Sequence, residues 1–173
     1  MCVTVMVPVV IGYGVESGDE GILKSSGKSI TIAQIENAIK LAKNENLEVA
    51  AHVIFGLPGE TMKTGKKTIK WLTGLNIDFA QIYCAVPWPS SALYGIAKEK
   101  GWLMTDNWEL YEQNNYIMNI GSITSKQVKH LRRVAMLRFY SSPARVFKMA
   151  KKINSFKKAK IFFAMLKEFA DWI

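Results

Sequence analysis

The feature that most constrains the fold of this chain is the regular alternation of apolar and helical segments over its first hundred residues. Apolar strands are predicted at 9–15, 48–55 and 79–86, and helices at 31–45, 61–74 and 90–100. The connections between them are short. Strand–helix–strand alternation of this kind is typical of a parallel sheet with right-handed crossovers, so the sequence predicts an α/β fold.

Several helix starts are marked by a hydroxyl residue followed three positions later by Glu or Gln, the spacing of a capping box. The pairs are Ser17 with Glu20, Thr31 with Gln34, and Thr124 with Gln127. We therefore expect helices to begin near each pair, the last of them running to a break at Ser142-Pro143 and then on to Ile173.

The unbroken apolar run at 48–55 is typical of a strand buried on both faces. It ends in Gly56-Leu57-Pro58-Gly59, and the other two strands are followed by equally unusual loops at 16–18 and 87–91. Because the carboxyl ends of parallel strands share one edge of a sheet, the three loops are predicted to form one ligand-binding rim.

Strand alternation places His52, Ile54 and Gly56 on one face of the second strand. We interpret His52 as a packed core residue rather than a catalytic one. Glu60 is interpreted as an acidic residue in the first turn of the next helix.

Two common nucleotide-binding motifs are excluded by spacing. Five residues separate Gly59 from Gly65, where a P-loop has four, and Lys67 stands where its hydroxyl residue belongs. The pair Gly12 and Gly14 lies inside a strand rather than after it.

The residues of the rim favour a ligand with a sugar and a flat ring. Glu16 and Ser17 together can bind ribose hydroxyls or an ammonium group. Gly56 allows a flat ring to approach the backbone closely, and Pro58 fixes the turn.

Charged residues are unevenly distributed along the chain. Residues 1–125 carry 10 basic and 12 acidic side chains, whereas 126–173 carry 13 and 2. The basic tail over 145–173 is interpreted as a solvated helical lid, as a helix at an anionic membrane surface, or as a nucleic-acid contact. The last is ranked third because the aromatic residues form no recognisable base-stacking module. The two cysteines, Cys2 and Cys84, form no disulfide framework, which favours a cytoplasmic location, with the tail as a peripheral membrane contact.

Taken together, Gly14-Val15-Glu16-Ser17-Gly18, then Phe55-Gly56-Leu57-Pro58-Gly59-Glu60-Thr61, then Pro87-Trp88-Pro89 resemble the second half of a radical S-adenosylmethionine (radical SAM) domain. The resemblance is to the branch that often carries a cobalamin-binding domain, and it covers about 10–105. It implies a fold: the C-terminal half of a partial (β/α)6 TIM-like barrel over 1–105, followed by a helical, basic C-terminal extension over 106–173.

The resemblance also implies cofactors: S-adenosylmethionine, a [4Fe–4S] cluster and, in this branch, cobalamin. Glu16 and Ser17 match positions near the ribose and methionyl groups. Ile54, Gly56, Val86 and Pro87 match positions beside adenine, and Pro58 belongs to the same loop.

One departure from the family pattern bears on chemistry. The family holds its cluster with three cysteines in a C-x3-C-x2-C loop, and this chain has no such loop and no metal ligands of its own. We therefore expect a truncated or split radical SAM enzyme, inactive alone, whose partner is the missing N-terminal half of the barrel. Its small-molecule or lipid substrate is unknown, and methyl transfer or ring closure would suit the branch. The alternative is a non-catalytic module acting through its basic tail on a membrane or a protein partner.

Overall fold

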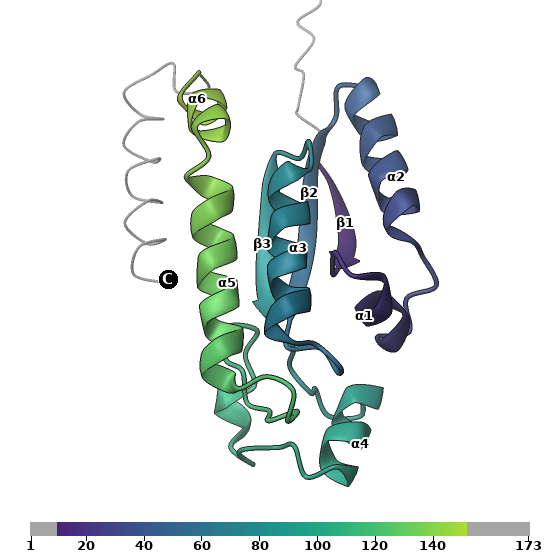
Figure 1. The fold of residues 1–173 in the computed structure, drawn as a ribbon, viewed down its shortest axis with the longest axis vertical. Helices are drawn as coiled ribbons and strands as arrows, with labels where there is room; N and C mark the ends of the chain where they lie inside the picture. The colour runs from purple at the N-terminus through teal and green to yellow at the C-terminus, as the bar shows by residue number, and fades with distance from the viewer. Residues whose placement is uncertain (1–9, 152–173) are drawn as a thin grey trace, which may run out of the picture.

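The computed structural model describes residues 10–151, and it contains one parallel sheet with helices packed on one of its faces (Figure 1). The strands are β1 (Val10–Glu16), β2 (Glu48–Phe55) and β3 (Phe79–Cys84), hydrogen-bonded in the order β1-β2-β3. The helices are α1 (Glu20–Ser25), α2 (Ile32–Asn44), α3 (Met62–Gly74), α4 (Ala92–Glu99), α5 (Ser125–Tyr140) and α6 (Pro143–Lys151), with a 3-10 turn at Trp108–Leu110.

Both strand pairs are parallel, which confirms the predicted α/β class. Glu16 lies opposite Val53, and Phe55 lies opposite Cys84, so the three strands end at the same edge of the sheet. The described residues hold three strands, and the barrel predicted from the resemblance needs strands beyond these.

Within residues 10–151, helices cover only one face of the sheet, and the prediction that β2 is buried on both faces is wrong there. Val49, Ala51, Val53 and Phe55 have no exposed surface, whereas the residues between them are half-buried. Figure 1 shows α3 across the front of the sheet with α5 and α2 on either side of it. The core forms between this helical layer and one sheet face, because each strand turns alternate side chains toward the helices.

The capping boxes predicted at Thr31 and Thr124 are confirmed, each with its reciprocal hydrogen bonds. The box predicted for Ser17 with Glu20 is wrong. Asp19 caps α1 instead, its carboxylate accepting from the N–H groups of Gly21 and Ile22. An aspartate two residues after Ser17 offers a stronger, charged acceptor to the same helix end.

Other predicted boundaries shift by a few residues. The third strand ends at Cys84 rather than at residue 86, and α4 begins after Ser91, whose hydroxyl accepts from the N–H of Tyr94.

Helix α5 seals the outer edge of β3. The Tyr140 hydroxyl donates to the Ala80 carbonyl at 2.8 Å and accepts from the Ala80 N–H at 3.2 Å. Arg132 donates through Nε to the Ile82 carbonyl at 3.1 Å. These contacts pair backbone groups that an edge strand otherwise leaves open.

Helix α6 is fixed to the end of α3 through Arg145. Its guanidinium lies 3.9 Å from the centre of the Phe139 ring and donates to the carbonyls of Thr73 and Leu75. Most of the basic tail predicted over 145–173 lies outside the described residues, and the readings proposed for it stay predictions.

Candidate functional site

The three loops predicted to form a rim do follow the three strand ends, at the lower edge of the sheet in Figure 1, close to α1 and α4. They are residues 16–18, 56–60 and 87–91. The structure places the predicted residues near one another but turns their side chains in different directions.

Glu16 is turned out of the regular strand. A register shift between Gly14 and Glu16 marks a β-bulge, and Glu16 has a φ of 54°, in the left-handed region that non-glycine residues avoid at a cost of about 1–2 kcal/mol. Its carboxylate lies 3.0 Å from the ammonium group of Lys28, which also donates to the Gly14 carbonyl at 3.1 Å. A strained backbone that re-aims a carboxylate is a feature found at binding sites.

Ser17 does not face the rim. Its side chain is fully buried, with Oγ 3.0 Å from the hydroxyl oxygen of Thr68 in α3. The Ser17 hydroxyl also accepts from the N–H of Asp19 at 3.2 Å. Ser17 therefore fixes the loop to the helical layer, and the polar partner of Glu16 at the rim is Lys28.

The Gly56 loop requires glycine because of Tyr116. Gly56 has a φ of +88°, and a Cβ atom built on it would lie 2.2 Å from the Tyr116 ring. The Tyr116 hydroxyl donates to the Gly56 carbonyl at 3.0 Å. The space beside Gly56 that was predicted to take the flat ring of a ligand is filled on this side by the ring of Tyr116. A ligand ring can reach only the other side of the loop.

Glu60 holds the same loop from inside. Thr61 is the N-cap of α3, so the interpretation of Glu60 as a first-turn acid is wrong. Its side chain is fully buried and accepts from the Gly56 N–H through Oε2, while Oε1 has no hydrogen-bond partner among the described residues. Burial raises the pKa of Glu60 to about 7.

The other predicted site residues divide between the open sheet face and the interior. Ile54 is half-buried on the sheet face away from the helices. Pro58 is half-buried, and its carbonyl accepts from the Ser25 hydroxyl at 3.0 Å. Val86 packs with Tyr111 and Ile117, and Pro87 is also buried. Val86 and Pro87 are therefore packed inside the protein and offer a ligand little exposed surface.

Sequence reasoning missed Lys28 and Tyr116. Lys28 follows Gly27, which has a φ of +78°, in the loop between α1 and α2. Tyr116 lies between the 3-10 turn and α5. Neither residue has a local signal, because each reaches the rim only through the tertiary fold.

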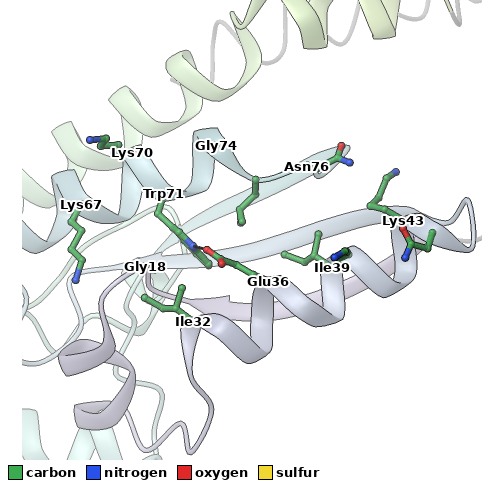
Figure 2. A pocket seen from close by; sticks show the side chains of 13 residues that line it. Gly18, Ile32, Glu36, Ile39, Lys43, Lys67, Lys70, Trp71, Gly74 and Asn76 are labelled. Carbon is green, nitrogen blue, oxygen red and sulfur yellow. Dashed lines mark hydrogen bonds between the residues drawn. The ribbon is translucent and has the colours of Figure 1, made fainter.

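A groove lies elsewhere in the described part of the chain. Figure 2 shows it between α2 and α3, with a volume of about 730 Å³, where the indole N–H of Trp71 donates to Glu36 at 2.8 Å. It opens on the helical layer and shares only Gly18 with the rim, so it is not part of the candidate site.

An iron–sulfur cluster does not fit the described residues. No group of three metal-ligating side chains occurs within 10–151. Burial raises the pKa of the Cys84 thiol to about 11. S-adenosylmethionine does fit in one respect, since the carboxylate of Glu16 and the ammonium of Lys28 complement an amino-acid zwitterion.

No helix among residues 10–151 combines the length and apolar character needed to cross a bilayer.

Comparison with known proteins relates part of the chain to one superfamily. The model of the radical SAM superfamily matches residues 6–72, which include β1, β2 and most of α3. Coproporphyrinogen III oxidase from Escherichia coli, described as a radical SAM enzyme, superposes with a TM-score of 0.54 over 76% of this chain and 26% of that chain. At 14% identity this likeness shows a shared fold alone.

Two archaeal relatives are more similar in sequence. An uncharacterized methyltransferase of Pyrococcus horikoshii is 37% identical over 131 residues, which is 76% of this chain and 28% of that protein. An uncharacterized protein of Methanocaldococcus jannaschii is 37% identical over 84 residues, 47% of this chain and 17% of that protein. The chain thus spans less than a third of the length of either relative. The family model thus supports a radical SAM relationship for residues 6–72, and intact members of that superfamily use S-adenosylmethionine and a [4Fe–4S] cluster.

Proposed function

We propose that the rim formed by Glu16, Lys28 and the Gly56 loop binds the methionyl and adenosyl groups of S-adenosylmethionine in a radical SAM protein. In this proposal residues 1–105 are the C-terminal half of a partial (β/α)6 barrel. The observation that carries it is the Glu16 carboxylate, re-aimed by a bulge and paired with Lys28 at 3.0 Å beside the end of β1.

The cluster would be held by cysteines outside these 173 residues, because Cys2 and Cys84 cannot form a three-cysteine loop. Such a cluster, held outside these residues, would supply one-electron reduction chemistry. The contribution of this chain is to bind and orient the cofactor, and the chain alone is expected to be inactive.

The reaction class is proposed as methyl transfer, with ring closure as the second option. The relative from Pyrococcus horikoshii, named as an uncharacterized methyltransferase, supports the first. Cobalamin use stays a prediction from the sequence resemblance, as does the division of the chain at residue 105.

The alternative module acting at a membrane has less support in the described residues. Arg145, the first cation of the basic tail, is used inside the protein to bind the end of α3.

Calorimetric titration of the 173-residue chain with S-adenosylmethionine tests the proposal. Saturable binding is expected, with an affinity at least tenfold weaker in Glu16→Gln, or about 1.4 kcal/mol, because a charged contact is lost. Glu45→Gln is the matched control, since Glu45 is exposed at the other end of α2 and should bind like the wild type. Absence of binding, or an equal loss in both variants, would refute the proposed site.

A further inference from the structure

The sheet face opposite the helices is polar at its centre. It is formed by alternate residues of the three strands: Gly12, Gly14, Ala50, His52, Ile54, Gln81 and Tyr83. Parallel sheets are usually buried on both faces, and such buried faces are apolar. A half-exposed parallel face that carries an imidazole, an amide and a phenol is therefore suited to contact a polar molecule.

The two glycines of β1 leave room above the strand. A Cβ atom at Gly12 would lie 3.0 Å from Nε2 of His52, and one at Gly14 would lie 3.1 Å from Oε1 of Glu16. His52 and the Glu16–Lys28 pair therefore lie over neighbouring positions of the same bare strand. Glycine inside a strand often marks such close approach.

Ring stacking, and not a hydrogen bond to its nitrogens, positions His52 within the described residues. Its imidazole stacks on Tyr83 with ring centres 6.3 Å apart and planes 24° apart. The Tyr83 hydroxyl in turn donates to Oε1 of Gln81 at 2.9 Å. Neither nitrogen of His52 has a hydrogen-bond partner within residues 10–151, and the Gln81 amide nitrogen has none there either. The interpretation of His52 as a packed core residue does not describe this half-exposed position.

The side-chain groups on this face that lack a hydrogen-bond partner within residues 10–151 are mainly donors. The Gln81 amide nitrogen and the His52 ring N–H can donate. The nearby Glu16 carboxylate is paired with Lys28. The other carboxylate on this face, Glu48, lies at the far end of β2.

We propose that this face binds the carboxylate or phosphate of a small molecule, with His52 as its hydrogen-bond partner and Gln81 as a second donor. The inference rests on the proposed function in taking that molecule to be the substrate, and it names the substrate as a polar acid. An apolar lipid chain would leave these donors unpaired, at a cost for each.

The test uses the two histidines of the chain, His52 and His130, of which His130 is exposed on α5 and serves as an internal control. Imidazole signals of the 173-residue chain are followed by nitrogen-15 NMR during titration with sodium acetate or with inorganic phosphate at constant ionic strength. A saturable shift of the His52 signal alone is expected. The probe that produces it tells whether the acid is a carboxylate or a phosphate.

Gln81→Leu should weaken that binding about tenfold, because one donor is lost while the strand position keeps a similar volume. Asn37→Leu, at an exposed position of α2, is the control. Parallel shifts of both histidines, or no saturable shift with either probe, would overturn the inference.

Titration of the same samples with S-adenosylmethionine separates the two proposals. If the cofactor binds and the anions leave His52 unchanged, the substrate inference fails and the proposed function stands. If the anions shift His52 and the cofactor does not bind, the anion site stands and the cofactor proposal fails.

Discussion

Glu60 shows how a single side chain can fix the shape of the candidate site. Its Oε2 accepts from the Gly56 N–H, and the Ser122 hydroxyl donates to its carbonyl at 2.7 Å. The loop after β2 is therefore tied both to its own strand end and to the segment before α5. The cost is a buried carboxyl oxygen without a partner among the described residues, and burial of the carboxyl group raises its pKa.

A pH dependence of stability follows from Glu60. Burial raises its folded-state pKa from 4.5 to about 7, so the folded protein holds this proton more tightly than the unfolded chain. The stabilising contribution is complete below pH about 4.5 and is lost as the pH rises through about 7, a change of about 3 kcal/mol. Urea unfolding at pH 5 and pH 8 should show this loss in the wild type and a smaller loss in Glu60→Gln, which keeps an acceptor for Gly56.

Glu45→Gln is the control for that experiment, because Glu45 is exposed. If Glu60→Gln and Glu45→Gln lose the same free energy between the two pH values, the raised pKa of Glu60 is contradicted.

At the scale of elements, α5 both extends the core and closes the sheet on one side. Val128, Leu131 and Ala135 are buried, as the helical spacing predicts. The Tyr140 hydroxyl has the further role of pairing both backbone groups of Ala80. The spacing of apolar residues predicts the buried face of the helix, but it carries no information about which strand that face meets.

Tyr140→Phe should therefore destabilise the protein by about 1–3 kcal/mol, because two backbone groups of Ala80 lose their partner. Chemical denaturation measures the loss, and amide exchange should become faster at Ala80. Tyr13→Phe is a suitable comparison, since the Tyr13 hydroxyl makes only a 3.4 Å contact with the Ala38 carbonyl. Equal losses in the two variants would show that Tyr140 acts by packing alone.

At the scale of the whole molecule, the two outer strands of the sheet differ. The outer edge of β3 is paired by α5 and by the Gln113 carbonyl, which accepts from the Cys84 N–H at 2.7 Å. On β1, the Gly14 carbonyl receives Lys28, and Gly12 and Gly14 are exposed. A neighbouring strand in a closed barrel would thus meet the sheet at β1 and not at β3.

Amide exchange should show this difference directly. We expect the amides of 11–14 in β1 to exchange at least tenfold faster than those of 80–84 in β3, because local opening is easier at the less covered edge. Mass spectrometry of peptic peptides, refined by NMR, measures both. Equal protection of the two strands would mean that both edges are covered alike.

The sequence by itself determined the parallel α/β class, two of the three predicted capping boxes and the edge of the sheet where the three loops gather. These features depend on periodicity and on residues three or four positions apart, so they can be seen in the linear chain. The tertiary structure decided that Ser17 faces α3, that Lys28 pairs with Glu16, that Tyr116 occupies the space at Gly56 and that Glu60 is buried. Apart from Glu60, these contacts join residues at least 12 positions apart, and the burial of Glu60 depends on such distant neighbours too. Their partners are set by how the helices and loops pack, which no local pattern encodes.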